Sequence, residues 1–440
     1  MEEQISLEQI KKFSEDYNSN KMNKIIENAI TKNGLENACI NRDVIIENQP
    51  IFNVELPESK RYDQKDSWRC WIYAGLNLIK HDVAKNLNMN VMDLELSNNY
   101  IAFFDKLEKS NNAYENIINL NNVEFDYLYK ESVIKYCVSE GGYWDWFVSI
   151  FNKYGIIPYS YNPDTVESAN YEKLGYLYTE KVKKDIMELI DLKKKGIEIR
   201  ELRERKNQFL KENYDILSKI LGEPLTEFNF EFKDKNGEYR RIEKITPIEF
   251  KNQFVNLKLD DFITIGNLPM YNKEYYKVYS KKYLGNIYNN SYATYLNLPI
   301  KDLKELTIKQ LKDNIPVYMG AHIFKFRDEK SGILDTRLYN YDEALNLKKL
   351  TKEEALNLYD ISMHHCMTFT GVNVVNEKPQ RWKIEDSYGD KEKVNGYYIM
   401  NDNFFDEFVL SVVIDKKYLS QEYLDLLKQE PIKFDVEDPF

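Results

Sequence analysis

The sequence predicts an α+β protein, with helices in its first half and strands in its last third. Apolar residues recur at helical spacing in the first half, whereas they alternate with polar residues near the C-terminal end. A highly charged helical segment lies between these two regions. Such a separation of helices from strands is typical of α+β architectures. Hydrophobic residues make up 43% of the 440 positions, so the chain can bury a large core.

The N-terminal part is expected to be a helix followed by an extended segment. Apolar residues over 5–29 have helical spacing, and Ser6 followed by Gln9 predicts a capping box at the start of this helix. Segment 44–56 contains Pro50, which favours an extended backbone.

The strongest helical pattern begins at Cys70 and continues to residue 85, which places Cys70 in the first turn of an apolar helix. Turn residues bound the further helices that we expect at 97–107, 113–120 and 144–154.

The middle of the chain is charged, and the C-terminal part favours strands. Segment 181–221 has helical spacing that should break at Gly196, and a hairpin is expected to turn at Asn236-Gly237. The pattern then predicts strands at 316–319, 367–375, 382–386, 397–400 and 409–414.

The composition excludes several classes of protein. Lys and Arg number 61 against 72 Asp and Glu, and this net charge of −11 argues against general nucleic-acid binding. No segment approaches the roughly 18–20 apolar residues of a membrane span. The N-terminus lacks the apolar core of a signal peptide. Four widely spaced cysteines predict reduced thiols, and we therefore expect a cytoplasmic protein.

Cys70 is the best candidate for a nucleophile. The positive end of the helix dipole lowers the pKa of a thiol at a helix N-terminus, and Arg69 adds a positive neighbour. From position alone, Cys70 is equally well explained as a small core residue. We expect the other three cysteines to be packing residues: Cys39, Cys137 and Cys366.

A cysteine nucleophile needs a base, and four histidines limit the search. His81 lies eleven residues further along the same helix, which is too far away, and His322 follows a short strand without further support. His364 and His365 begin an apolar strand, on which neighbouring side chains point to opposite faces. A metal site formed with Cys366 is therefore not expected. No other Cys/His cluster has zinc spacing, so the sequence predicts neither metal nor cofactor.

Asp386 follows His365 by 21 residues, at the end of the next predicted strand. Two adjacent antiparallel strands would bring this carboxylate beside the imidazole, where it would fix the tautomer and stabilise the imidazolium. Alternatively, Asp386 only opens the turn before Gly389.

Three segments resemble one family in the order expected. DQKDSWRCW resembles the Gln-x5-Cys-Trp signature of papain-like cysteine peptidases, and more closely their bleomycin hydrolase/aminopeptidase C branch. The resemblance implies that Cys70 is the nucleophile and Gln64 an oxyanion-hole donor. MHHCMTFTGVNV and RWKIEDSYGD resemble the segments that carry the base and its orienting residue, here His365 and Asp386. Further landmarks extend the likeness over essentially the whole chain.

The resemblance implies a papain-like fold with a large insertion, because 295 residues separate Cys70 from His365. It also implies a cysteine aminopeptidase acting on peptides, assembled as a homohexamer, with the C-terminal tail in the cleft. We accordingly divide the chain into an N-terminal helix and arm (1–60), a helical part with the nucleophile (61–165), an inserted helical and hairpin region for oligomerisation (166–300), a β-rich part with His and Asp (301–428) and a tail directed to the active site (429–440).

Three residues depart from the family pattern. Asp386 replaces an Asn and should raise the pKa of His365. Trp68 replaces a glycine, so it could narrow, fill or block the substrate cleft. The tail ends early at Phe440, and its carboxylates could attract a substrate α-ammonium group or simply be solvated. These departures leave two alternatives open, a silent homologue that acts as a binding or assembly module and a peptidase with relaxed, endopeptidase-type specificity.

Overall fold

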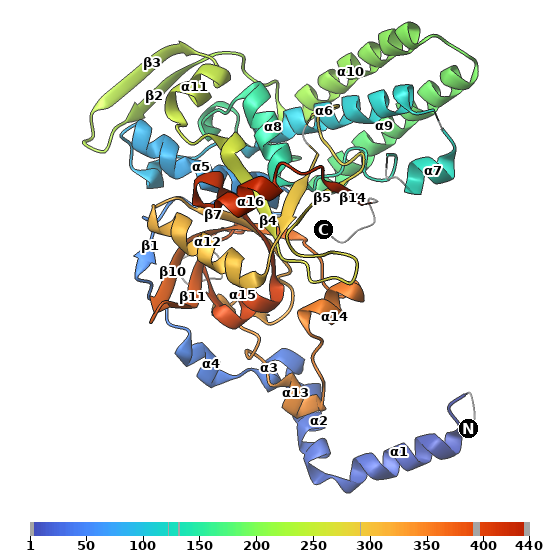
Figure 1. Cartoon of the computed structure of the whole chain (residues 1–440), viewed down its shortest axis with the longest axis vertical. Helices are drawn as coiled ribbons and strands as arrows, with labels where there is room; N and C mark the ends of the chain where they lie inside the picture. The colour runs from blue at the N-terminus through green and yellow to red at the C-terminus, as the bar shows by residue number, and fades with distance from the viewer. Residues whose placement is uncertain (1–3, 122, 131–132, 291, 390–396, 435–440) are drawn as a thin grey trace.

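The computed structural model describes residues 4–121, 123–130, 133–290, 292–389 and 397–434 (Figure 1). It confirms the α+β class: a helical layer and a long charged helical pair lie on one side, and a large sheet forms the rest of the body.

The N-terminal segment forms two helices, α1 (Leu7–Ser19) and α2 (Lys21–Asn33), so the prediction of one helix over 5–29 was wrong. The expected capping box of Ser6 is confirmed. Asn20 interrupts the helix, because its backbone is extended and its side chain accepts a hydrogen bond from the Met22 N–H at the start of α2.

The segment that follows is more helical than expected. It contains α3 (Leu35–Cys39), α4 (Arg42–Glu47) and only a short strand, β1 (Val54–Glu55). Asn41 caps α4 by accepting a hydrogen bond from the backbone N–H of Asp43. The prediction of an extended segment over 44–56 was therefore wrong for residues 44–47, which lie in α4.

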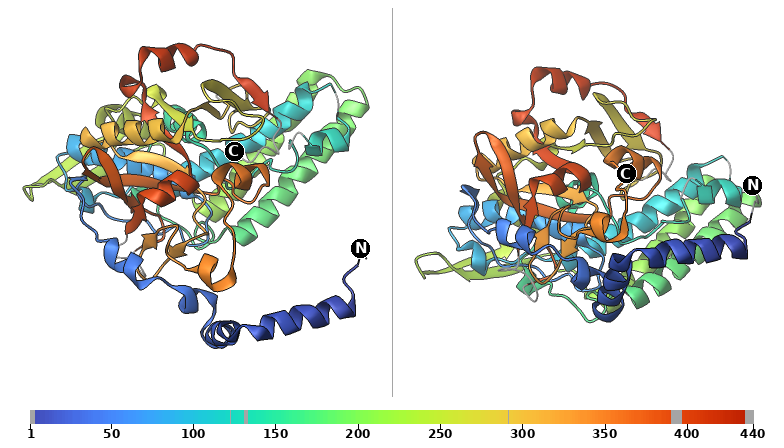
Figure 2. Two further views of the ribbon diagram at one scale, coloured as in Figure 1. Left: turned by 60° about the horizontal axis from the view of Figure 1, so that its bottom comes forward. Right: turned by 90° about the horizontal axis from the view of Figure 1, so that it is seen from below.

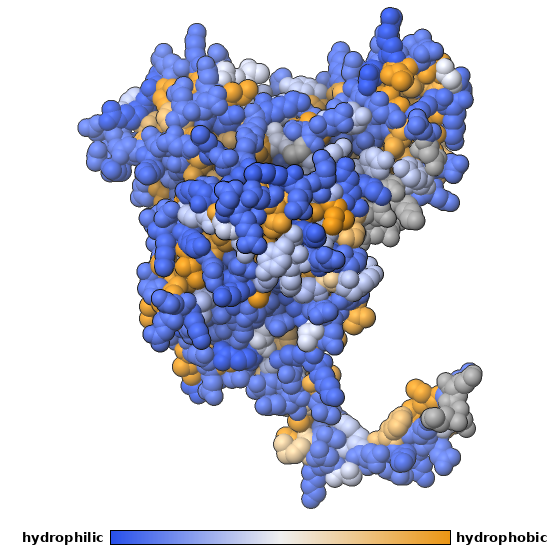
Figure 3. Space-filling view, in the orientation of Figure 1, coloured by the Kyte–Doolittle hydropathy of each residue, from blue (hydrophilic) through white to orange (hydrophobic). Residues whose placement is uncertain are grey.

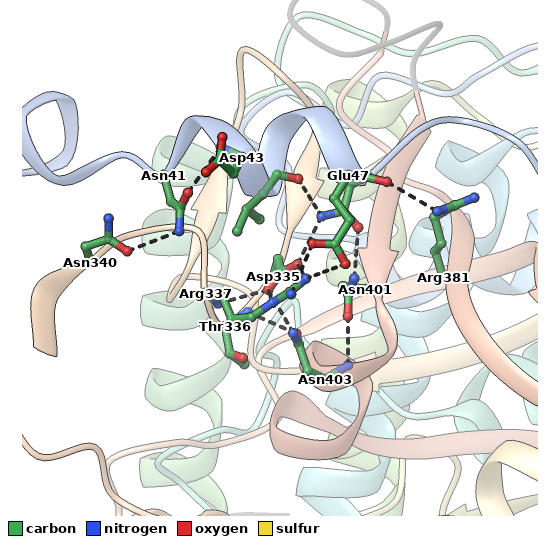
Figure 4. A network of polar contacts seen from close by, with 12 residues as sticks. Asn41, Asp43, Glu47, Asp335, Thr336, Arg337, Asn340, Arg381, Asn401 and Asn403 are labelled. Carbon is green, nitrogen blue, oxygen red and sulfur yellow. Dashed lines mark hydrogen bonds and ion pairs between the residues drawn. The ribbon is translucent and has the colours of Figure 1, made fainter.

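A polar network fastens α4 to the body of the molecule (Figure 4). The Arg337 guanidinium bridges Glu47 on α4 and Asp335, at 3.1 and 2.8 Å. Asn48 donates to the same Asp335 carboxylate at 3.0 Å, and Arg381 donates to the Glu47 carbonyl. Helices α1 and α2 bury no side chain. They project away from the body in Figure 1 and in the left view of Figure 2.

The helical layer consists of α5 (Cys70–Asn86), α6 (Asn98–Asn119), α7 (Phe125–Lys130) and α8 (Trp144–Tyr154). The helices expected at 97–107 and 113–120 are one continuous α6. Its polar middle does not break the helix because Lys109 pairs with Asp105 at 2.6 Å and the Ser110 hydroxyl donates to the Lys106 carbonyl.

The charged region forms a helical pair and a hairpin, as predicted. The pair is α9 (Tyr171–Lys194) and α10 (Ile199–Leu221), separated at Gly196, whose φ of 77° favours glycine. The pair packs on α6 around an apolar cluster of its own. The hairpin of β2 (Phe228–Lys233) and β3 (Tyr239–Ile245) is a separate two-stranded sheet, followed by α11 (Pro247–Phe254).

The main sheet of the described residues has 12 strands. Its strands in chain order after β1 are β4 (Phe262–Gly266), β5 (Lys277–Lys281), β6 (Thr294–Asn297), β7 (Val317–Ala321), β8 (Arg327–Asp328), β9 (Ile333–Leu334), β10 (His365–Val375), β11 (Lys378–Glu385), β12 (Tyr397–Asn401), β13 (Val409–Asp415) and β14 (Ile432–Phe434). The five strands predicted for the C-terminal part are β7, β10, β11, β12 and β13.

The spatial order in this sheet is β14-β5-β6-β4-β13-β7-β10-β11-β12-β9-β8, with β1 on β10. Further helices lie among the strands in the chain: α12 (Ile300–Lys312), α13 (Tyr341–Leu345), α14 (Lys352–Asn357), α15 (Asp402–Phe408) and α16 (Gln421–Leu426). The structure also describes the 3₁₀ helices Val91–Asp93, Tyr159–Tyr161, Leu259–Asp261 and Lys416–Tyr418. Strands β4, β5 and β6 join this sheet although their residues were grouped with the insertion. The five-part division stays a prediction.

Helix α5 packs directly on β10 and β7, and one apolar cluster spans the two layers. The Thr368 hydroxyl of β10 donates to the Ala74 carbonyl of α5 at 3.3 Å. The N-terminus of α5 therefore meets the first residues of β10, where the candidate site lies.

Candidate active site

Cys70 is the first residue of α5 and is half-buried. Among the described residues no side chain caps this helix N-terminus, although the Ile72 N–H donates to the Arg69 carbonyl. The positive end of the helix dipole therefore faces Cys70. Arg69, expected as a positive neighbour, is buried and pairs with Glu140 at 3.2 Å. The positive charge of Arg69 is therefore paired with the Glu140 carboxylate.

His365 lies between Cys70 and Asp386. Its Nε2 atom is 2.8 Å from Asp386 Oδ1, and its side chain hydrogen-bonds the Cys70 sulfur. Burial opposes a charge on His365, but the negative charges of Asp386 and Cys70 outweigh it and raise the pKa of His365 to about 10. The imidazole is therefore protonated at neutral pH.

The pKa of Cys70 lies well below its ordinary value. A hydrogen bond from Cys366 has the largest effect, burial opposes it, and the charge and hydrogen bond of His365 act in the same direction as Cys366. Cys70 and His365 thus form a thiolate–imidazolium pair, which is the reactive state of a cysteine nucleophile.

Asp386 follows β11 directly and is 1% exposed. The Ser387 N–H donates to the same Oδ1 atom that bonds His365, at 2.7 Å. A turn does follow, with Gly389 at a φ of 69°. Asp386 therefore both starts a turn and hydrogen-bonds the imidazole, and its role as the orienting residue stays a prediction.

Gln64 is buried beside the Asp386 loop, where its N–H donates to the Ser387 carbonyl at 2.5 Å. The Ser387 hydroxyl donates to Gln64 Oε1 at 2.7 Å. This contact engages the acceptor of the side-chain amide, and the amide also hydrogen-bonds the Tyr388 side chain. The role of Gln64 as an oxyanion donor stays a prediction.

Two residues of the site were not predicted from the sequence. The Tyr388 ring stacks on His365, with ring centroids 5.5 Å apart and planes 17° from parallel. Cys366, taken as a packing residue, hydrogen-bonds Cys70. Strand alternation indicates that Cys366 faces the same side as Thr368, but not that this side faces the nucleophile.

Trp68 stands two residues before Cys70 and has a φ of 59°, in the region that favours glycine. A glycine, which the resembled pattern has at this position, would adopt this backbone conformation without strain. The Trp68 side chain is 67% exposed, and its ring packs on Tyr171 at the start of α9, with centroids 6.0 Å apart.

The tail leaves the sheet from a defined position, because β14 pairs in parallel with β5. Phe440, Asp435, Glu437 and Asp438 lie outside the described residues. Their predicted role stays a prediction.

The remaining histidines lie apart from Cys70. Burial, with a smaller effect of Lys80, lowers the pKa of His81 to about 3. His322 stacks on His364, with centroids 4.4 Å apart. Over the described residues, no group of three His, Cys, Asp or Glu side chains could hold a metal ion, and no helix has the length and apolar character to cross a membrane.

Comparisons with known proteins agree with this geometry. The model of the Peptidase C1-like family matches residues 4–440. Aminopeptidase C of Listeria innocua serovar 6a is 35% identical over 440 residues, covering 100% of this chain and 99% of the relative. Aminopeptidase W of Lactobacillus delbrueckii subsp. lactis is 30% identical over 436 residues, covering 99% of each.

A solved structure supports the same conclusion at the level of the fold. The crystal structure of PepW from Lactobacillus rhamnosis HN001 is 34% identical and has a TM-score of 0.94, covering 100% of this chain and 99% of that one. Because these matches span the whole chain, the protein belongs to the Peptidase C1-like family of papain-like cysteine peptidases.

Proposed function

We propose that the protein is a cysteine aminopeptidase that removes N-terminal residues from peptides. The observation that carries the proposal is the hydrogen-bonded series Cys70–His365–Asp386, in which the thiolate, the proton donor and the orienting carboxylate are in contact. Relatives over the full length bear the names aminopeptidase C and aminopeptidase W.

The chemistry follows from this geometry. The Cys70 thiolate attacks the carbonyl carbon of the first peptide bond, and His365 protonates the departing amine. Gln64 and the Cys70 N–H stabilise the oxyanion, and one such donor typically contributes about 3–4 kcal/mol. His365 then removes a proton from water, which hydrolyses the thioester.

Exopeptidase specificity requires a group that recognises the free α-ammonium of the substrate. We assign this role to the acidic side chains of the tail after β14, Asp435, Glu437 and Asp438. Their charge is opposite to that of the α-ammonium group, and β14 fixes the point from which the tail starts.

We also propose a cytoplasmic homo-oligomer, a hexamer by resemblance. The four free cysteines fit a reducing compartment. The arm of α1 and α2 has no buried side chain, and α1 exposes an apolar row of Leu7, Ile10, Phe13 and Tyr17. Orange, hydrophobic patches are visible on the arm (Figure 3). An apolar row of this kind favours burial against a second copy of the chain.

Hydrolysis of matched peptides tests the aminopeptidase proposal. Aminoacyl fluorogenic substrates with a free amine should be cleaved, and their N-acetylated counterparts should be cleaved far more slowly. Cys70→Ser should abolish turnover, because a serine hydroxyl is not ionised by His365 at this site. Cys137→Ser is the matched control, since Cys137 lies in the separate cluster of α6, α9 and α10.

Equal cleavage of both substrate types would instead indicate endopeptidase-type specificity. Undiminished turnover by Cys70→Ser would refute the assignment of the nucleophile. Absence of turnover in the wild type on any peptide would favour a silent binding module.

A further inference from the structure

The second cysteine of the site, Cys366, forms no bond with the substrate in the peptidase mechanism, although its hydrogen bond lowers the pKa of Cys70. Cys366 follows His365 on β10 and is 5% exposed. Its thiol is in hydrogen-bonding contact with the Cys70 sulfur, and its backbone N–H also bonds that sulfur. Two of the four cysteines of the chain are therefore side by side at the nucleophile.

The pairing is specific to these two cysteines. Cys70 and Cys366 belong to the same apolar cluster between α5 and the sheet. Cys137 lies in the cluster of the charged helical pair, and Cys39 lies near α4. Both therefore belong to clusters other than that of Cys70.

The two thiols differ in their ionisation. The hydrogen bond from Cys366, and then the positive charge and hydrogen bond of His365, lower the pKa of Cys70 well below its ordinary value. The hydrogen bond to Cys70 and then burial raise the pKa of Cys366 well above its ordinary value. Since the thiolate is the form that reacts with oxidants, a peroxide attacks Cys70 first. Cys366 stays protonated beside it.

We propose that Cys366 is a resolving cysteine, which forms a reversible disulfide with Cys70 after a hydroperoxide has oxidised the nucleophile. The inference rests on the proposed function only in that Cys70 is the reactive thiolate. It does not depend on which peptides are cleaved.

The reaction balances in two steps. The Cys70 thiolate attacks one peroxide oxygen, the O–O bond breaks, and a sulfenic acid forms. The departing hydroxide or alkoxide takes up a proton from solvent and leaves as water or an alcohol. The Cys366 sulfur then attacks the Cys70 sulfur, an S–S bond forms and the S–O bond breaks. The departing hydroxide leaves as water with the proton of the Cys366 thiol.

Oxidation of Cys70 itself prepares the second step. The contact that most disfavours ionisation of Cys366 is the one with negatively charged Cys70. A sulfenic acid is neutral, so the charge of Cys70 no longer disfavours ionisation of Cys366 once Cys70 is oxidised. The disulfide would protect Cys70 from further, irreversible oxidation to sulfinic and sulfonic acids.

The test treats the reduced, full-length protein with hydrogen peroxide and then with dithiothreitol. Wild type should lose activity and two hydrogen atoms in mass, give a cross-linked peptide containing Cys70 and Cys366, and recover its activity on reduction. Cys366→Ala and Cys366→Ser should gain oxygen atoms at Cys70 and recover little of their own initial activity. Cys39→Ala should behave as the wild type does.

Oxygen adducts at Cys70 without a cross-link in the wild type would overturn the proposal, and so would full recovery of both Cys366 variants. The mass and peptide readouts need no substrate turnover. A cross-link in a protein that cleaves no peptide would therefore refute the aminopeptidase proposal and support this one.

Discussion

At the scale of single residues, the pair of Asp386 and His365 distinguishes this chain from the resembled branch, which has a neutral Asn in place of the carboxylate. Asp386 is buried, and its Oδ1 atom bonds both the imidazole and the Ser387 N–H. A buried negative charge at this distance stabilises the imidazolium more than a neutral amide can. The substitution should therefore extend the active pH range upward.

Asp386→Asn tests this effect. The reactive ion pair exists between the pKa of Cys70 and that of His365, so activity falls as pH rises through the pKa of His365. Without the carboxylate, the pKa of His365 should decrease by about 1–3 units. The basic limb of the pH profile of kcat/KM should move to lower pH by the same amount, while Asp386→Glu should keep the limb near its original place. An unchanged limb in the Asn variant would show that Asp386 does not control His365.

Local patterns predicted the candidate residues Cys70 and His365, but not their neighbours. A helix N-terminus at Cys70 and a strand starting at His365 are local features, visible in the spacing of apolar residues. The contact between Cys366 and Cys70 depends on how β10 packs on α5, and the sequence pattern carries no information about that packing. Tyr388 lies two residues after Asp386, in the segment RWKIEDSYGD that resembles the family. Its proximity to Asp386 in the sequence could have indicated that it lies in the site.

At the scale of elements, a buried ion pair joins the helix of the nucleophile to the strand of the orienting residue. Lys80 on α5 bonds Glu385, the last residue of β11, at 2.5 Å, and both side chains are 0% exposed. The Ser59 hydroxyl also donates to Glu385, at 2.9 Å. Because Glu385 precedes Asp386, this pair holds the two halves of the site together.

Lys80→Met should destabilise the protein by about 3–5 kcal/mol, because Glu385 is left as an unpaired buried charge. It should also lower kcat, since the ion pair would no longer fix the position of Glu385, which directly precedes Asp386. The measurement is the urea midpoint of unfolding together with the turnover of the folded variant. Lys301→Met is the control: Lys301 and Glu305 form an exposed pair on α12, worth at most about 1 kcal/mol. Equal midpoints for the two variants would contradict the proposed role.

At the scale of the whole molecule, the chain consists of a compact body and an arm. The break between α1 and α2 at Asn20 and the start of α4 at Asn41 each depend on one side-chain hydrogen bond. The spacing of apolar residues alone therefore did not predict them. Pairing of β4, β5 and β6 in the main sheet is likewise non-local. Fold class, by contrast, followed from periodicity over long segments.

The arm gives a direct test of the proposed assembly. Replacing Leu7, Ile10 and Phe13 by Glu should reduce the mass in solution to that of a smaller species, because the apolar row of α1 would lose its partner surface. Replacing Glu8, Lys12 and Glu15 on the opposite face by Gln should leave the mass unchanged. Native mass spectrometry measures both variants. A wild type of monomeric mass would refute the assembly.

The central claim is that Cys70 exists as a thiolate paired with His365, and its alkylation by iodoacetamide as a function of pH tests this claim most directly. Peptide mass analysis would follow Cys70, with buried Cys39 and Cys137 as internal controls. The account predicts rapid alkylation of Cys70 down to about pH 6 or below, with the controls unreacted in the folded protein. A rate that increases only near pH 8.5, as for an ordinary thiol, would contradict it.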